Sequence, residues 1–156
     1  MAQYLGLTID GLLFSGQNEE KFINAYKQKW AETMSDTYFQ SEAIDVGHKL
    51  RPRLVFWGYS ANSVLFEDDN IENVAQIAVC IELIHKASLL LDDFIDKDTT
   101  RHSSPTFYVE HGVEKTIIYA LNLLSKSLEL LNKTYYKCTT SSFYYKSLRD
   151  ISLTLQ

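Results

Sequence analysis

Cysteine, proline and glycine are all scarce in this chain of 156 residues, which has two cysteines, two prolines and six glycines. Cys80 and Cys138 give no basis for a disulfide framework, so a cytoplasmic, reducing location is expected. Neither cysteine has another Cys or His at ligand spacing, which leaves a metal-binding role as the weaker alternative. The few helix breakers, together with apolar residues that recur at helical intervals, predict an all-α fold.

Positive charge and long apolar runs are also limited. The formal net charge is -5, so no broad basic field is present to collect a nucleic acid or an anionic membrane surface. The apolar runs fall short of the roughly 20 residues that a transmembrane helix needs, and the first residues lack the basic start of a secretion signal. We therefore expect no nucleic-acid partner and no transmembrane segment. The 46% of hydrophobic residues suffices for the core of one domain over residues 1–156.

The apolar periodicity predicts an antiparallel helix bundle. The predicted helices cover residues 18–38, 48–66, 70–97, 109–133 and 142–155. Asp69 or Asn70 is a candidate cap for the third helix, Pro105 stops its continuation, and Gly112 lies close to the next start. The Tyr- and Thr-rich residues 134–145 are predicted to form an irregular connection.

The predicted helix over residues 70–97 changes character along one face. At about 100° per residue, one set of side chains falls within ~40° of a single line, and Asp93 lies to one side of it. The set consists of Val74, Ala78, Ile81, His85, Leu89, Asp92 and Asp96. This face suits a ligand with a hydrocarbon tail and a charged head. Because Mg²⁺ commonly uses one or two carboxylates together with substrate phosphates, Asp92 and Asp96 are predicted metal ligands.

A solvated acidic helix end is the competing interpretation of LDDFID. Carboxylates at a helix carboxyl end oppose the macrodipole, and like charges one turn apart repel each other. Such an end is destabilised without a cation, which favours metal binding. An EF-hand calcium loop fits poorly, because the glycine and the final glutamate that it requires are not at their positions.

The segment ELIHKASLLLDDFIDKDTTRHSSPT, residues 82–106, resembles the first aspartate-rich region of trans-isoprenyl diphosphate synthases, the polyprenyl synthetase family. The similarity includes the DDxxD motif, the ELIH lead-in and the later Asp-Thr, Arg and Pro-Thr. It extends to VGHKLRPRL and to HGVEKTIIYALNLLSKSLELL, and so covers roughly residues 40–132. The resemblance implies that the chain forms the N-terminal half of the isoprenoid synthase fold, which would be incomplete here.

The same resemblance implies roles for four catalytic residues. Asp92 and Asp96 would bind Mg²⁺, Arg101 would hold the allylic diphosphate, and Asp93 would support the site. Arginine suits this role because its planar fork pairs with phosphate oxygens and keeps its charge. In the family, an allylic carbocation develops as diphosphate leaves, and isopentenyl diphosphate attacks it. The resemblance therefore implies a prenyltransferase of isoprenoid biosynthesis.

The homoallylic diphosphate would lie near Lys49, Arg51 and His85 by the same correspondence. Taken alone, His85 is more typical of a hydrogen-bonded core histidine, and Arg51 of a helix surface. The sequence departs from the family pattern at His48, where Lys is usual, at Lys49, where Arg is usual, and at His102, where a second Arg is usual. Since histidine is mostly neutral at pH 7, we expect weaker binding of isopentenyl diphosphate, or another acceptor.

Ala87 and Ser88 lie just over one turn before the motif, where short-chain members carry bulky aromatic residues. Small side chains here either let a long prenyl tail pass, with Ser88 beside the substrate, or allow close packing of helices. Both interpretations stay open at this stage.

No second DDxxD motif occurs before Gln156. We therefore expect a truncated chain, a pseudogene-like fragment or one subunit of a heteromer, with apolar faces that a homodimer or another synthase subunit would cover. Two other functions remain open: a non-catalytic or regulatory subunit of a prenyl diphosphate synthase, and a terpene cyclase-like enzyme.

Overall fold

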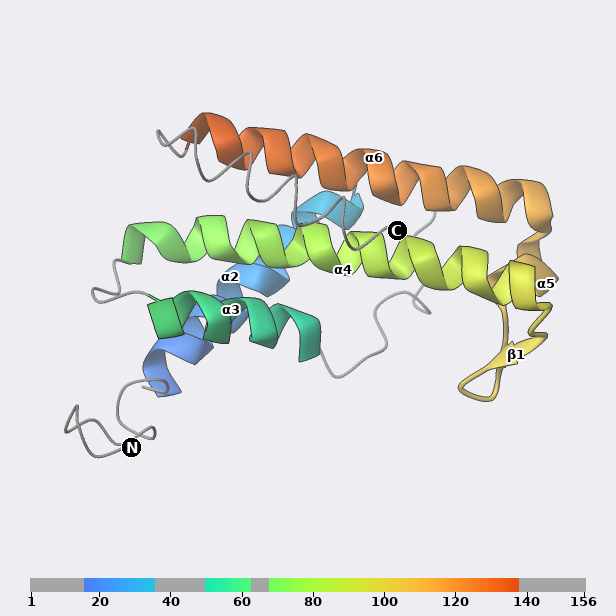
Figure 1. The fold of residues 1–156 in the computed structure, drawn as a ribbon, viewed down its shortest axis with the longest axis horizontal. Helices are drawn as coiled ribbons and strands as arrows, with labels where there is room; N and C mark the ends of the chain where they lie inside the picture. Colours follow the sequence, from blue (N-terminus) through green and yellow to red (C-terminus); the bar gives the residue numbers. More distant parts are fainter. Residues whose placement is uncertain (1–15, 36–49, 63–67, 138–156) are drawn as a thin grey trace.

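The computed structural model describes residues 16–35, 50–62 and 68–137, and Figure 1 shows their arrangement. The helices are α2 (Gly16–Ser35), α3 (Leu50–Asn62), α4 (Asp68–Asp96), α5 (Phe107–His111) and α6 (Val113–Lys137). Two short strands, β1 (Thr100–Arg101) and β2 (Ser104–Pro105), form an antiparallel hairpin between α4 and α5. The all-α prediction is confirmed for this part of the chain, with a small hairpin that was not predicted.

The long helix α4 lies at the centre of the fold. Helix α6 runs along one side of it, and α2 and α3 contact it as well (Figure 1). The middle of α4 is buried, and its side chains with no exposed surface are Ala75, Ala78, Val79, Cys80, Leu83 and Ala87. Aromatic rings from α2 and α3 cover this surface, with Phe22 and Phe56 stacked 4.8 Å apart. Because burial of one such large side chain contributes about 1.5–3 kcal/mol, this contact surface fixes the position of α4.

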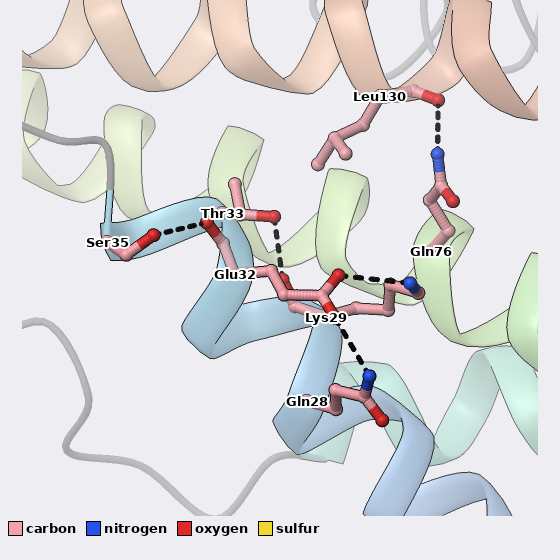
Figure 2. Close-up of polar contacts among 7 residues, drawn as sticks. All are labelled: Gln28, Lys29, Glu32, Thr33, Ser35, Gln76 and Leu130. Carbon is pink, nitrogen blue, oxygen red and sulfur yellow. Dashed lines mark hydrogen bonds and ion pairs between the residues drawn. The ribbon is translucent and has the colours of Figure 1, made fainter.

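Two hydrogen bonds set the register of α4 against α6. Gln76 Nε2 donates to the Leu130 carbonyl at 2.9 Å (Figure 2), and Ser127 Oγ donates to the Cys80 carbonyl at 3.1 Å. The partner on α6 moves backward as the position on α4 moves forward, so the two helices are antiparallel. Both polar side chains are buried, and leaving either unpaired would cost about 1–3 kcal/mol.

The helix over residues 109–133 was predicted as one element, and this prediction was wrong. The structure has α5 and α6 instead, separated by Gly112, whose φ of 89° is readily adopted only by glycine. The prediction of an irregular connection from residue 134 was also wrong at its start, since α6 continues to Lys137. Thr134 is buried there and donates to the Leu130 carbonyl at 3.0 Å, so packing overrides the low helix propensity of threonine.

The other predicted boundaries differ by smaller amounts. Helix α4 begins before the predicted start, so Asp69 and Asn70 lie within the helix and do not cap it. The predicted helix 142–155 lies outside the described residues, as do the ends of the predicted helices 18–38 and 48–66.

Helix α4 is long and apolar enough, by length and composition alone, to cross a membrane between Asn70 and Asp96. In the fold, 61% of its most apolar window is buried inside the protein. The core helix of a soluble protein meets the same criterion, so this feature is weak support for a membrane span. The expected absence of a transmembrane segment stays a prediction.

Candidate functional site

The DDxxD motif forms the last turn of α4, and the helix ends there in a Schellman motif. Lys97 has a left-handed backbone conformation with φ of 60°, and its amide donates to the Phe94 carbonyl at 3.3 Å. The amide of Asp98 donates to the Asp93 carbonyl at 2.9 Å. These two bonds fix the direction in which the chain leaves α4, and therefore the position of the hairpin relative to the motif.

The carboxylates of the motif have different surroundings. Asp92 and Asp96 are exposed, whereas the side chain of Asp93 is only 7% exposed. A buried carboxylate requires a partner, and Arg101 Nε donates a 2.8 Å hydrogen bond to Oδ1 of Asp93. Nη2 of Arg101 pairs with the same oxygen and lies 3.7 Å from Oδ2 of Asp92. Arg101 thus connects the buried carboxylate to an exposed one.

Arg101 lies in a negatively charged environment. The hydrogen bond that Arg101 donates to Asp93 is the main cause that raises the pKa of the guanidinium, and the charges of Asp93, Asp92 and Asp98 act in the same direction. The guanidinium therefore stays charged, and it keeps its fork shape at every physiological pH. Among the described residues, the contacts of Arg101 with Asp93 and Asp92 use Nε and Nη2, and Nη1 carries two further N–H donors.

A tight hairpin presents Arg101 to the motif. Arg101 on β1 pairs with Ser104 on β2, and the two residues between them, His102 and Ser103, have φ of 50° and 67°. Positive φ at both central positions is typical of a type I′ turn. Histidine tolerates this conformation better than most residues do. His102, which stands where the family pattern has Arg, is therefore an exposed turn residue.

His85 lies on α4 before the motif and is half-buried. Burial lowers the pKa of its imidazole from the ordinary 6.5, and the positive charge of Arg51 on α3 lowers it further. His85 is therefore neutral at pH 7. Arg51 is exposed, as predicted for a residue on a helix surface, and the charge of Arg101 also reaches His85. The charges of two predicted site residues, Arg51 and Arg101, therefore act on a third, His85. His48 and Lys49 lie outside the described residues.

The predicted change along one face of α4 is present in the burial of its side chains. Val74 and Ala78 are buried, Leu89 is half-buried, and Asp92 and Asp96 are exposed. The face therefore opens progressively toward its acidic end. Within the described part of the chain, this end is accessible to a charged group from solvent.

Ala87 and Ser88 have separate environments, which helps to choose between their two interpretations. Ala87 is fully buried within the core cluster, so its small size allows close packing of the helices. Ser88 is exposed, and its hydroxyl donates to the His85 carbonyl at 2.8 Å. Ser88 alone of this pair is on an accessible surface.

A cavity of about 200 Å³ lies between the end of α4 and the hairpin. Its lining includes Lys86, Leu90, Asp93, Arg101 and Thr106. Lys86 is buried, and its Nζ lies 4.0 Å from Oε1 of Glu82, one turn earlier. Neither Lys86 nor Thr106 was predicted as a site residue. The Glu-to-Lys spacing of four residues was an available signal for Lys86, but no local pattern indicates the burial of Thr106.

The donor set at the end of α4 fits Mg²⁺ shared with a phosphate. In residues 16–35, 50–62 and 68–137, no group of three or more His, Cys, Asp or Glu side chains could hold a metal ion. Asp92 and Asp96 provide two exposed carboxylates one turn apart, and Mg²⁺ usually completes such a set with water and substrate phosphates. Cys80 is a poor ligand, because burial raises its thiol pKa to about 12 and keeps it protonated.

The comparison with protein families decides the assignment. The model of the family described as polyprenyl synthetase matches residues 28–153, most of the chain. This chain belongs to the polyprenyl synthetase family. The match includes the DDxxD motif and the hairpin, so the resemblance on which the predicted site residues depend is confirmed at the level of the family.

Curated relatives in the polyprenyl synthetase family match only part of their own length. A geranylgeranyl diphosphate synthase of Methanosarcina mazei is 33% identical over 91 residues, which are 58% of this chain and 26% of that protein. A short chain isoprenyl diphosphate synthase of Methanocaldococcus jannaschii is 32% identical over 87 residues, 56% of this chain and 25% of the relative. A heptaprenyl diphosphate synthase component 2 of Bacillus subtilis is 31% identical over 87 residues, 56% and 24% respectively. The matched region thus spans about a quarter of these relatives.

Solved structures confirm the fold of this polyprenyl synthetase chain. A geranyltransferase from Helicobacter pylori superposes with a TM-score of 0.60 at 19% identity, over 85% of this chain and 50% of that one. A second crystal structure, of a geranyltransferase from the same organism complexed with magnesium and isoprenyl diphosphate, superposes equally well over 48% of its length. This partial coverage agrees with the expectation that the chain corresponds to the N-terminal half of the family fold.

Proposed function

We propose that this polyprenyl synthetase chain binds an allylic isoprenyl diphosphate through Mg²⁺ on Asp92 and Asp96, as part of a prenyltransferase. The observation that carries the proposal is the exposed carboxylate pair beside Arg101, whose Nη2 is 3.7 Å from Asp92. Two carboxylates alone repel a diphosphate, whereas carboxylates, a divalent cation and a guanidinium together complement it. The solved relative complexed with magnesium and isoprenyl diphosphate supports this choice of ligand.

Each residue of the proposed site has a separate task. Arg101 binds phosphate oxygens through Nη1 while Asp93 holds its other side, and the half-buried Leu89 contacts the prenyl chain behind the head group. Bound Mg²⁺ would neutralise the diphosphate and so favour its departure. The apolar part of the α4 face excludes water from the carbon that loses the diphosphate. Because Asp93 is buried, it orients Arg101 and does not itself reach the metal.

We extend the proposal to the acceptor, which we expect to carry less negative charge than isopentenyl diphosphate. His85 is neutral at pH 7 and offers a hydrogen bond without a charge. His102, where the family pattern has a second arginine, is exposed at the hairpin turn. The fixed positive charges that act on His85 come from Arg51, Lys86 and Arg101.

Calorimetric titration with geranyl diphosphate tests the metal-dependent binding. We expect binding in the presence of MgCl₂ and none with EDTA. Asp92→Asn and Asp96→Asn should each weaken binding by at least about 100-fold, the upper range for substitutions of residues that only support metal ligands. Glu72→Gln removes the same charge from the exposed surface of α4 away from the motif, and should leave the affinity within about twofold. Binding that is independent of Mg²⁺ or insensitive to both Asp variants contradicts the proposal.

Titration with isopentenyl diphosphate tests the acceptor separately. We expect affinity at least about tenfold lower than for the allylic ligand, since His85 is neutral at pH 7 and the exposed His102 stands where the family pattern has a second arginine. Equal and tight binding of the two diphosphates would show that the acceptor is isopentenyl diphosphate itself.

A second candidate function is that of a subunit in a multi-chain prenyl synthase. Helix α6 supports it, because Ile118, Leu121 and Leu128 lie on one side of the helix and are 61%, 58% and 53% exposed. Such a stripe is typical of a surface that another chain covers. The curated relative described as a synthase component belongs to the same family. Sedimentation of the wild type and of Leu121→Glu tests it: a monomer in both cases counts against a homomeric contact through α6.

A further inference from the structure

We infer that Thr106 is a positioning residue for the diphosphate-binding pair: its hydroxyl ties the hairpin to the end of α4 and so holds Arg101 on Asp93. The inference rests on the proposed function, because it concerns how Arg101 is presented to a phosphate group. Thr106 does not touch the ligand. It acts through the backbone between α4 and the hairpin.

Thr106 is the hydrogen-bonding centre of this region. It is 2% exposed, and its Oγ1 donates to the Asp98 carbonyl at 2.7 Å. Its amide donates to the Thr99 carbonyl at 3.1 Å, and its own carbonyl accepts from the amides of Val109 and Glu110 at 3.1 and 3.2 Å. One residue thus connects the end of α4, the base of the hairpin and the first turn of α5.

The hydroxyl makes this tie in place of its usual bond. Thr106 occupies the N-cap position of α5 with an extended backbone, where a threonine oxygen ordinarily accepts a bond from the helix. No such side-chain cap is formed here. The hydroxyl donates instead to Asp98, whose amide donates to the Asp93 carbonyl. A short path of hydrogen bonds therefore leads from Thr106 to the residue whose carboxylate holds Arg101.

Apolar packing does not hold the hairpin in place. His102, Ser103, Ser104 and Pro105 are all exposed, and the cavity of about 200 Å³ lies between the hairpin and α4. Space beneath an element that is hardly buried lets it shift when a tie is removed. The bonds of Thr106 and the pairing of Arg101 with Asp93 act on the hairpin together with the Schellman bonds that end α4. Directly after the hairpin, Phe94 of α4 also packs edge-on against Tyr108 of α5.

The test compares Thr106→Val, which keeps the shape and loses the hydroxyl, with Thr106→Ser, which keeps the hydroxyl. The first readout is the ¹⁵N–¹H signal of Arg101 Nε in the full chain, assigned by its loss in Arg101→Lys. We expect its hydrogen exchange to become at least about tenfold faster in Thr106→Val and to stay within about twofold of the wild type in Thr106→Ser. The second readout is the affinity for magnesium pyrophosphate, which should fall about tenfold in Thr106→Val and recover in Thr106→Ser.

Thr116→Val is the matched control for stability. Thr116 is also fully buried, and its hydroxyl donates to the Gly112 carbonyl at 2.8 Å, away from the motif. Thr116→Val should lower the melting temperature without changing the Arg101 signal.

An unchanged Arg101 signal in folded Thr106→Val, or a lost one in folded Thr106→Ser, overturns the inference. If Thr106→Val does not fold, Thr106→Ala removes the hydroxyl without adding a methyl group; if that variant also fails to fold, Thr106 supports the fold as a whole and the inference is again overturned. Wild type that shows the Arg101 signal but binds no magnesium pyrophosphate contradicts the proposed function alone.

Discussion

The two ends of helix α4 follow opposite rules, although they belong to one continuous helix. From Ile71 to Leu83, most side chains are buried, and the polar Gln76 is paired with a carbonyl of α6. From Ser88 to Asp96, exposed residues are frequent, and the exposed charges are all negative. Burial stabilises the helix at one end. The other end can therefore carry a charge arrangement that is unfavourable to folding.

The largest expected difference concerns aliphatic side chains at the two ends. Leu83 is fully buried, whereas Ile95 is 69% exposed. Leu83→Ala should therefore lower the free energy of unfolding by about 2–5 kcal/mol, because it removes buried surface and leaves a cavity. Ile95→Ala removes a side chain of similar size and should change it by less than about 0.5 kcal/mol. Urea denaturation at 25 °C measures the free energy of unfolding of both variants. Similar losses would show that the two ends of α4 contribute equally to stability.

A smaller effect, confined to the carboxyl end of α4, is expected for acidic residues. Asp96 lies at the carboxyl end of α4, one turn from Asp92, so both the macrodipole and charge repulsion act against it. Asp96→Asn should raise the free energy of unfolding by about 0.3–1 kcal/mol without metal. Glu72 lies beyond the first turn of α4 with Asp68 four residues before it, so the weak macrodipole effect and the like-charge repulsion oppose each other, and Glu72→Gln should change the free energy of unfolding by less than about 0.3 kcal/mol.

Addition of magnesium pyrophosphate provides a further test of the prediction for Asp96→Asn. It should stabilise the wild type in proportion to its occupancy and leave Asp96→Asn unchanged, because only the wild type retains both carboxylates. Thermal denaturation with and without the ligand measures the difference. If the acidic end of α4 contributes to binding at the expense of folding, Asp96→Asn is more stable than the wild type without ligand and gains no stability from the ligand. If the acidic cluster is purely structural, Asp96→Asn is less stable than the wild type.

The long helix and its graded face could be predicted from the sequence, since the helical periodicity of 70–97 is strong over many turns. The same periodicity placed Asp92 and Asp96 together and Asp93 to one side. It could not show that Asp93 is buried, because that burial depends on a hairpin formed by residues beyond the helix. It also could not show the pairing of Asp93 with Arg101, which separates the roles of two adjacent aspartates.

The hairpin itself was beyond local sequence patterns. Its strands have two residues each, which is too few for an alternating pattern. The turn residues His102 and Ser103 are also not the Asn-Gly or Asp-Gly pairs that are typical of a type I′ turn. Its position is set by tertiary bonds of Thr106 to Asp98 and Thr99. Gly112, in contrast, was a usable signal: it lies at the break between α5 and α6, although the helix before it was not anticipated.

The smallest expected effect concerns His85, which lies where the buried part of α4 meets the open part. Burial, and then the charge of Arg51, lower its pKa below the unfolded value of 6.5. The carboxylate of Glu82 opposes this shift, and Lys86 and Arg101 add to it. As the pH falls below 6.5, the unfolded chain gains a proton that the folded chain resists, so stability decreases toward acid pH.

His85→Gln should reduce the slope of unfolding free energy against pH between about 6.5 and 5. Ser88→Ala removes a neighbouring bond but no titrating group, and should keep the wild-type slope. Urea denaturation across this range measures both, and an unchanged slope in His85→Gln would show that solvent reaches the imidazole as freely as it does at the acidic end.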